Sequence, residues 1–418
     1  MLRRAFVLLL GTVALAACTG ASGYGPRSYG GGPPVPLPPP SASGQPAGPT
    51  GQRVAILLPL SGPRAEIGQT MLQAAKLALD APDAPPLDSR DTGGTPEGAA
   101  AAAQAAIAQG AGLILGPLTS QETAAVAPIA RAANVAVLAF TNDPSQAQPG
   151  VWTLGITPSQ QVRRLVAAAQ GQGKSQFAAL LPENDFGRAM GQALTQATDS
   201  MGSAANVRFY GSGMAAINAA ARDLSGYASR RGPLDAQIRA ARALGTPEGR
   251  RQAADLSRSS VPPPSFNALL LADTGEALSE LAAVLPYYDI DRSSVQILGP
   301  ALWASPSSGA SQFRGAWYAA PDPAARSGFE QAYSAKFGNT PSPLGDLAYD
   351  AASIARVLGS RGYAIGALTQ PAGYVGADGW FALLSDGQVR RALAVFTIER
   401  GGAQMVEPAP QAGNVPGV

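Results

Sequence analysis

The stretch RVAILLPLSG, residues 53–62, decides how the chain folds. It contains five consecutive apolar residues, Val54 to Leu58, and such a short apolar run is typical of a strand buried on both faces of a parallel sheet. A turn at residues 59–62 follows. Apolar side chains then return at helical spacing over residues 65–80, so the stretch predicts a strand, a turn and a crossover helix.

The same alternation continues along the chain. Further strands are predicted at 112–117, 135–140, 176–182, 207–210, 266–273 and 295–299, and further helices at 99–109, 122–133, 158–170, 186–200 and 275–285. Buried strands separated by helices indicate parallel sheets covered on both faces, with right-handed crossovers. The strands are too many for one small sheet and divide near residues 154–157. We therefore expect an α/β fold with two doubly wound, Rossmann-like lobes.

The segment from Gly213 to Pro264 interrupts this alternation. It carries eight arginines against four acidic residues. Its pattern predicts one or two amphipathic helices, bounded by the Gly-Pro pair at 232–233 and by the prolines at 262–264. Two interpretations stay open: a basic surface for an anionic polymer or partner, or a helical excursion whose charges are simply solvated.

The first eighteen residues predict export and lipidation. Arg3 and Arg4 precede an apolar run over residues 5–15, which is too short to span a bilayer but typical of a signal peptide. The run ends in LAAC, where small residues lead to Cys18, the only cysteine of the chain. We therefore expect residues 1–17 to be a signal peptide and Cys18 to be lipidated; the alternative is an ordinary signal peptide beside an accidental cysteine. Thr19, rather than an aspartate, favours sorting to the outer membrane.

Residues 18–51 are rich in proline, glycine and serine, with few apolar anchors. Such a segment cannot bury enough surface to offset its ordering entropy, so we expect a disordered linker. At about 3 Å per residue it could extend on the order of 100 Å, far enough to let an anchored domain reach outward. A featureless spacer is the alternative. Residues 406–418 are expected to be a tail.

Composition excludes several kinds of chemistry. The chain has no histidine, which removes Ser-His and Cys-His nucleophilic sites and histidine metal sites. AAAQGQGKS, residues 167–175, resembles a phosphate-binding loop, but Ala168 replaces its first glycine and the segment joins a helix to a strand instead of a strand to a helix. A net charge of +2 gives no reason to expect nucleic acid. We expect no catalytic residue, metal or cofactor, and no enzyme.

A ligand cleft is a better-supported expectation, since ligands of open parallel sheets sit beyond the carboxyl ends of the strands. Three loops of the first lobe fall at that edge: residues 59–62, 116–120 and 141–144. Their hydroxyl, amide and carboxylate side chains are the candidate cleft residues Ser61, Thr119, Ser120, Thr141, Asn142 and Asp143. Plain N-capping of the following helices is the alternative for each of them.

Several of these stretches resemble a known family. VAILLPLSG with Gly68, GLILGPLTS (112–120), VAVLAFTND (135–143), LLPENDFGRAM (180–190) and LAYDAASIARVL (347–358) are similar to the type I periplasmic-binding fold of the branched-chain amino-acid-binding proteins. GPLTS, FTND, GYVG (373–376) and DGQVRRALAVFTI (386–398) resemble more closely a branch of lipoproteins that activate penicillin-binding proteins.

The resemblance implies a bilobal domain over residues 52–405 with a hinge between its lobes. The first lobe would comprise about 52–155 and 300–365, and the second about 156–299 and 366–405. By the same resemblance, Ser120 takes a ligand-hydroxyl position, Thr141 a main-chain contact and Phe186 the position of an aromatic ring that covers the ligand. By the same resemblance, Asp273 or Glu276 would meet a ligand ammonium group.

Asp143 departs from the family pattern, because amino-acid binders place a carboxylate-binding threonine there. An aspartate would repel a ligand carboxylate. Two functions therefore stay open. The first is a non-enzymatic periplasmic lipoprotein, anchored in the outer membrane, that regulates peptidoglycan synthesis by binding a penicillin-binding protein. The alternative is a solute-binding receptor that delivers a small polar ligand to an ABC transporter, for which a short tether and inner-membrane retention would have been expected.

Overall fold

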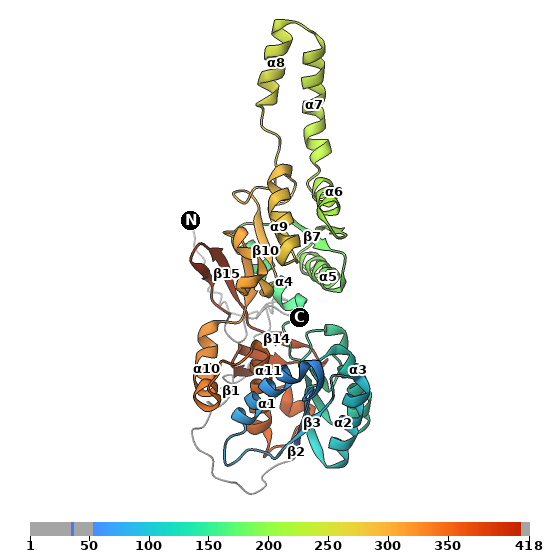
Figure 1. The fold of residues 1–418 in the computed structure, drawn as a ribbon, viewed down its shortest axis with the longest axis vertical. Helices are drawn as coiled ribbons and strands as arrows, with labels where there is room; N and C mark the ends of the chain where they lie inside the picture. Colours follow the sequence, from blue (N-terminus) through green and yellow to red (C-terminus); the bar gives the residue numbers. More distant parts are fainter. Residues whose placement is uncertain (1–34, 37–52, 411–418) are drawn as a thin grey trace, which may run out of the picture. The chain divides into compact units, whose positions relative to one another are not determined.

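The structure is a computed structural model that describes residues 35–36 and 53–410. The expected signal peptide, Cys18 and nearly all of the linker lie outside the described residues. The described chain is a mixed α/β protein whose main sheets form two lobes (Figure 1).

The first lobe is built on a fully parallel five-stranded sheet in the order β3-β2-β4-β5-β6. Helices α1, α10 and α11 cover one face, where Met71, Tyr333 and Ile354 are fully buried, and α2 and α3 cover the other. The elements are β2 (Arg53–Leu58), α1 (Ala65–Ala78), β3 (Leu87–Asp91), α2 (Pro96–Ala108), β4 (Ala111–Leu115), α3 (Ser120–Ala132), β5 (Ala136–Ala139), β6 (Val151–Thr153), α10 (Pro323–Phe337), α11 (Pro343–Leu358) and α12 (Ile365–Leu368).

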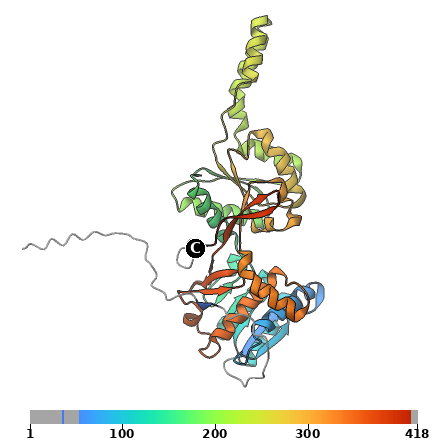
Figure 2. The ribbon, with the colours of Figure 1, turned by 90° about the vertical axis from the view of Figure 1, so that its left-hand side faces the viewer.

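The second lobe has a seven-stranded sheet in the order β16-β15-β11-β10-β9-β7-β8. Strands β7 to β11 are parallel, whereas β15 and β16 add antiparallel strands at one edge; Figure 2 shows these two strands, coloured red, within this lobe. The elements are α4 (Pro158–Gly171), β7 (Phe177–Pro182), α5 (Asp185–Asp199), β8 (Asn206–Tyr210), α6 (Met214–Leu224), α7 (Tyr227–Ala243), α8 (Pro247–Ser257), β9 (Ala268–Leu271), α9 (Gly275–Val284), β10 (Gln296–Gly299), β11 (Trp317–Ala320), β15 (Ala394–Glu399) and β16 (Gly402–Glu407).

A third, small sheet has the order β1-β12-β13-β14. It consists of β1 (Val35–Pro36), β12 (Tyr374–Gly376), β13 (Gly379–Leu383) and β14 (Val389–Arg391). Tyr374, Phe381 and Leu383 are buried in the same core as α1 and α11, so this sheet belongs with the first lobe. Its strand β1 lies within the linker for which no regular structure was expected.

The expected two-lobed α/β architecture is confirmed, but the expected boundaries between the lobes differ from the structure. Residues 300–320 were assigned to the first lobe, whereas β11 pairs with β10 in the second. Residues 366–391 were assigned to the second lobe, whereas β12 to β14 pack on the first. The chain thus adds one more strand, β11, to the second sheet before it returns to the first lobe. The apolar run WYAA at 317–320 is too short to have predicted that strand. Strand β16 also includes the first two residues of the expected tail.

The arginine-rich segment 213–264 forms three helices instead of one or two. The Gly-Pro pair at 232–233 does not end a helix, because Pro233 lies inside α7. A proline removes one backbone hydrogen bond, but α7 continues past it and packs through Ile238 and Ala241 on Ala253 of α8.

Candidate functional site

A cleft of about 880 Å³ opens at the carboxyl ends of β4, β5 and β6. It is lined by the loops after these strands, by the segment between β10 and β11, and by the start of α11. The lining residues are Leu118, Thr119, Ser120, Phe140, Thr141, Asn142, Asp143, Gly155, Ile156, Ala301, Leu302, Ala304, Ser305, Ala320, Pro321, Pro343, Leu344, Leu347 and Asp378. The cleft thus brings together five predicted residues, Thr119, Ser120, Thr141, Asn142 and Asp143.

The loop after β4 can approach the sheet closely because it begins with glycine. Gly116 has a φ of +86°, and a Cβ there would lie 2.4 Å from the carbonyl oxygen of Leu57. Any other residue would be strained in this conformation and would collide with β2. The close approach positions the start of α3, and with it Thr119 and Ser120, at the edge of the cleft.

Thr119 is chiefly a helix cap. Its hydroxyl accepts the backbone N–H of Glu122 at 3.3 Å, and the Glu122 carboxylate accepts the backbone N–H of Thr119 at 3.0 Å, a complete capping box. Glu122 is buried and also accepts the hydroxyl of Thr92 at 2.6 Å. The capping interpretation therefore accounts for Thr119, although its side chain borders the cleft.

Ser120 and Asp143 form the polar centre of the cleft. The Ser120 hydroxyl donates to the Asp143 carboxylate, which also accepts the backbone N–H of Ser145 at 2.9 Å. The backbone N–H of Asp143 donates to the hydroxyl of buried Thr141 at 3.1 Å. Partial burial pushes the pKa of Asp143 upward, but the hydrogen bonds from Ser120, Ser145 and Gln146 outweigh burial and hold that pKa below its usual value. Asp143 is therefore a carboxylate at neutral pH.

The cleft contains one acid that the sequence did not suggest. Asp378, in the turn between β12 and β13, lines the cleft and is 6% exposed. Its carboxylate lies 3.6 Å from the guanidinium of Arg391. Asp378 sits in the sequence Ala-Asp-Gly, which is typical of an ordinary hairpin turn, so nothing in the local pattern marked it.

Two further buried acids, Asp346 and Asp350 of α11, lie near Asp378. Burial, together with the charge of Asp378, raises the pKa of Asp346 to about 7, against the hydrogen bond from Arg326. Burial also raises the pKa of Asp350 well above its usual value, again with a contribution from Asp378. The i, i+4 spacing of two acids inside a largely apolar helix was the signal that could have found this cluster.

Four predicted residues do not line the cleft. Ser61 is exposed, and its backbone N–H donates to Asp91 at 3.2 Å. Phe186 is half-buried against the core between α4, α5 and the second sheet. Asp273 and Glu276 line a different pocket.

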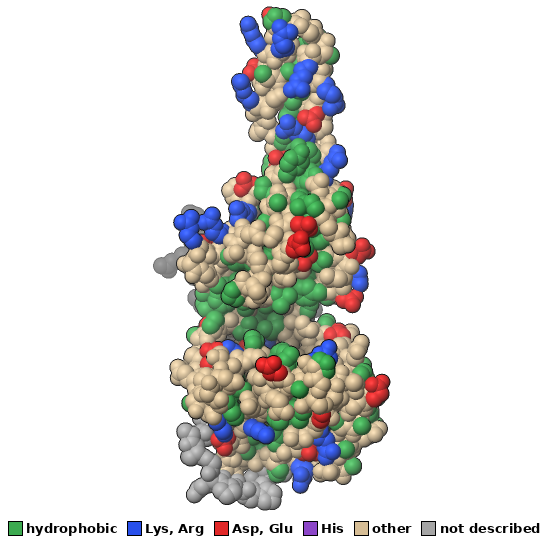
Figure 3. All heavy atoms as spheres, viewed as in Figure 1, with side chains coloured by type: hydrophobic (Ala, Val, Ile, Leu, Met, Phe, Trp, Pro, Cys, Tyr) green, Lys and Arg blue, Asp and Glu red, His purple; other side chains and the backbone are tan. Residues whose placement is uncertain are grey.

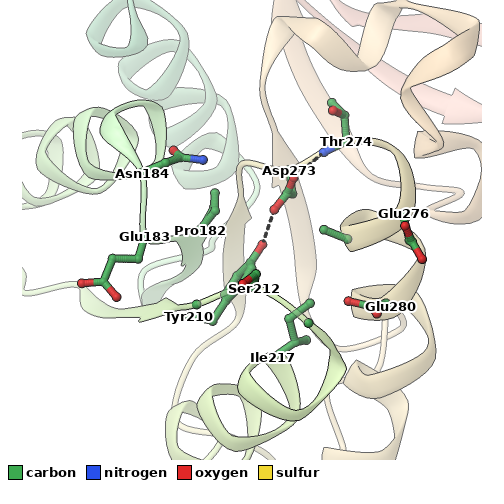
Figure 4. Close-up of a pocket in the computed structure, with 13 residues that line it drawn as sticks. Pro182, Glu183, Asn184, Tyr210, Ser212, Ile217, Asp273, Thr274, Glu276 and Glu280 are labelled. Atoms are coloured by element: carbon green, nitrogen blue, oxygen red, sulfur yellow. Dashed lines mark hydrogen bonds between the residues drawn. The ribbon is translucent and has the colours of Figure 1, made fainter.

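That second pocket, of about 660 Å³, lies at the carboxyl ends of β7, β8 and β9 (Figure 4). The Tyr210 hydroxyl donates to Asp273 at 2.9 Å, and the backbone N–H of Thr274 donates to the same carboxylate at 3.0 Å. Burial, and then the Asp273 charge, raise the pKa of Tyr210 far above its usual value, so it remains a neutral donor. The acids Glu183, Asp273, Glu276 and Glu280 make this pocket anionic.

Within the described residues 53–410, no group of three histidine, cysteine, aspartate or glutamate side chains is arranged to hold a metal ion. None of the helices described there combines the length and the apolar character that crossing a membrane requires.

Comparison with solved structures shows the same two-lobed fold. A protein from Rhodospirillum rubrum, described as a branched-chain amino acid ABC transporter, is 19% identical with a TM-score of 0.65, covering 85% of this chain and 100% of that one. The leucine-binding protein LivK from Thermotoga maritima is 17% identical with a TM-score of 0.53, over 85% of this chain and 98% of that one. The C-domain of LpoA from Haemophilus influenzae, a regulator of PBP1A, is 18% identical with a TM-score of 0.58, over 85% and 99%.

Among curated proteins, an uncharacterized protein of Rickettsia prowazekii, RP748, is 27% identical over 174 residues. That match spans 41% of this chain and 47% of the relative, which is about half the relative's length. The family described as "Periplasmic binding protein" matches residues 51–403, nearly the whole described chain. The chain belongs to the periplasmic binding protein family, whose type I fold the resemblance in its sequence had indicated.

Proposed function

We propose that this protein is a non-enzymatic, lipid-anchored periplasmic regulator of peptidoglycan synthesis that acts by binding a penicillin-binding protein. The observation that carries the proposal is the ionised Asp143 in the cleft. Its position corresponds, by the sequence resemblance, to the threonine with which amino-acid binders hold the ligand carboxylate.

The charges around the cleft disfavour a free amino acid. No lysine or arginine is among the described residues that line it, so nothing there offsets the charge of Asp143. Two like charges about 4 Å apart repel by about 1 kcal/mol in water and about 4 kcal/mol near a protein surface. The second value would weaken binding about a thousandfold. The Ser120 hydroxyl is also engaged by Asp143 and is not free to donate to a ligand.

The likeness to the LpoA C-domain, described as a regulator of PBP1A, supports the regulatory role. The expected lipidation of Cys18, the residue Thr19 after it and the linker of residues 18–51 belong to the same proposal. A tether of on the order of 100 Å suits a domain that reaches from the outer membrane toward a synthase.

A solute receptor of an ABC transporter is the second candidate. The cleft volume of about 880 Å³ favours it, because small-molecule pockets usually measure about 300–1,000 Å³. Its walls are mostly apolar with a few polar groups, as such pockets require. The likeness to the leucine-binding protein LivK also supports a solute receptor.

Two measurements on the purified chain separate these functions. In the first, thermal unfolding is followed with leucine, other amino acids and their amides. A ligand at about 100 times its dissociation constant adds about 2.7 kcal/mol of stability, so a receptor would show a clear shift. In the second, binding to a purified bifunctional penicillin-binding protein from the same organism is titrated. We expect no shift with amino acids and saturable binding to the synthase; the reverse pattern would establish the receptor.

A further inference from the structure

Helices α7 and α8, with the turn between them, form an antiparallel pair over residues 227–257, which we term the arginine hairpin. The two helices pack on one another through Ile238, Ala241 and Ala253. This small cluster is separate from the two cores that hold the second lobe together. The outer part of the hairpin, which holds this cluster, therefore adds little to the stability of the lobe, and its presence calls for another explanation.

The base of the hairpin is fixed to the lobe. The ring of Tyr227 lies edge-on to Tyr288, with their centroids 5.2 Å apart. Arg230 donates to the carbonyl oxygens of Ser225 at 2.7 Å and Tyr288 at 2.9 Å, and it pairs with Asp289 at 3.2 Å. A surface held in this way loses little conformational entropy when a partner binds.

The outer part of the hairpin is basic, and Figure 3 shows basic side chains, all of them arginine in this segment, gathered over α7 and α8. Arg239, Arg242 and Arg251 are exposed and have no ion-pair or hydrogen-bond partner among the described residues. Arg250 uses only one N–H group, on the carbonyl of Gly245 at 3.1 Å. Between residues 236 and 254 the single acid is Glu248.

This charge is local to the segment. Residues 213–264 carry eight arginines and four acids, a net +4 in a chain whose total is +2, so the remaining residues carry a net −2. A membrane surface is the less suitable target, because interfacial helices need a broad exposed apolar face. In the hairpin the apolar residues face inward, and Leu244 is its only strongly exposed large hydrophobic side chain among the described residues, at 62%.

We propose that the arginine hairpin is a docking surface for an acidic face of a protein partner. Guanidinium groups pair with carboxylates through two parallel hydrogen bonds, which fix orientation as well as contribute energy. Such pairs also accelerate association at low ionic strength. This proposal stands whether or not that partner is the penicillin-binding protein of the proposed function.

The test uses the purified full chain and two probes, fluorescent poly-L-glutamate and vesicles containing phosphatidylglycerol. The hairpin variant changes Arg239, Arg242, Arg250 and Arg251 to glutamine. The matched control removes the same charge from exposed arginines elsewhere, namely Arg188, Arg314, Arg361 and Arg400. Circular dichroism checks that both variants are folded.

We expect the parent chain to bind poly-glutamate and to lose that binding as salt is raised toward about 1 M, where the screening length falls to about 3 Å. An exposed ion pair strengthens binding by roughly 1.5- to 5-fold, so the hairpin variant should bind at least about fivefold more weakly, and the control within about twofold of the parent. No binding by the parent, or equal losses in both variants, would overturn the proposal. Tighter hairpin-dependent binding to vesicles than to poly-glutamate would overturn it in favour of a membrane surface.

Discussion

The hydroxyl of Ser120, at the start of α3, donates a hydrogen bond to the carboxylate of Asp143, in the loop after β5. This contact joins two of the three loops that the sequence placed at the edge of the first sheet. Because it stabilises the charged form of Asp143, it also sets the charge that any ligand entering the cleft would meet.

Replacing Ser120 with alanine should expose this contribution in the pH dependence of stability. The folded-state pKa of Asp143 is lowered, so its contribution is present above the unfolded pKa of about 3.9 and is lost as pH falls through the folded value. Ser120→Ala should therefore lower the free energy of unfolding by about 1 kcal/mol at neutral pH. The difference from the parent chain should shrink at about pH 3 and below. Urea titrations at both pH values measure it.

The control is a double-mutant cycle with Asp143→Asn. If the hydrogen bond carries the effect, Ser120→Ala should change stability far less in the Asp143→Asn background, because the charged acceptor is gone. An undiminished effect in that background would show that Ser120 acts through helix α3 instead.

The buried acids beside the cleft predict the opposite pH trend. Burial raises the pKa of Asp346 to about 7, so the folded state binds more protons than the unfolded state between about pH 4 and pH 7. The resulting stability is fully present below the unfolded pKa and is lost as pH rises through the folded value. Asp346→Asn should remove part of the decline in unfolding free energy between about pH 5 and about pH 8.

Asp350 acts in the same direction and stays in that variant, so the slope should be reduced and not abolished. Urea titrations across this pH range, fitted with a common denaturant slope, provide the measurement. Parallel profiles for the parent chain and Asp346→Asn would contradict the assignment of the titration to Asp346.

Glycine at position 376 makes room for the carboxylate of Asp350, which accepts the backbone N–H of Ala377 at 2.7 Å. A Cβ on Gly376 would lie 2.3 Å from the Asp350 carboxyl carbon. Asp350 is buried on α11 and cannot move aside, so Gly376→Ala should lower the free energy of unfolding by about 1–3 kcal/mol.

The matched control is Gly328→Ala, in the exposed middle of α10, where no atom would lie near the new Cβ. There alanine should stabilise the helix by about 0.5–1 kcal/mol. Chemical denaturation of both variants tests the pair. A neutral Gly376→Ala would mean that α11 and β12 can separate without cost.

Much of the architecture was predictable because it rests on buried apolar strands. Strands β2, β4 and β7 are apolar runs bounded by turns, and each was placed within one or two residues. Strand β3, with the sequence LDSRD, was missed because it lies at the edge of the sheet and carries polar side chains. Edge strands need no apolar pattern on their exposed side, so the spacing of apolar residues along the sequence cannot find them.

The candidate site was predictable only in part, for a related reason. The rule that ligands bind at the carboxyl ends of strands brought Ser120, Thr141 and Asp143 to one cleft. Asp378 reaches that cleft from a small sheet formed late in the chain, a long-range arrangement that no local pattern encodes. Asp273 follows β9 of the other sheet and therefore lines a pocket of the second lobe.

Excising the outer part of the arginine hairpin should leave the rest of the protein folded. Replacing residues 234–256 with a short Gly-Ser turn removes the Ile238–Ala253 cluster but none of the residues in the two cores of the second lobe. The melting temperature should change by only a few degrees, since a loss of about 1 kcal/mol shifts it by about 2–4 °C in domains of this size. Helical signal and poly-glutamate binding should fall together.

Arg230→Ala is the informative comparison, because it disrupts the base and keeps the tip. Removing its guanidinium leaves the carbonyl groups of Ser225 and Tyr288 without their donor, which should cost roughly 1–3 kcal/mol. The excised chain should thus be the more stable of the two, although it lacks many more residues. If excision instead unfolds the second lobe, the hairpin is part of that lobe's core, and its arginines would need a structural explanation before a docking one.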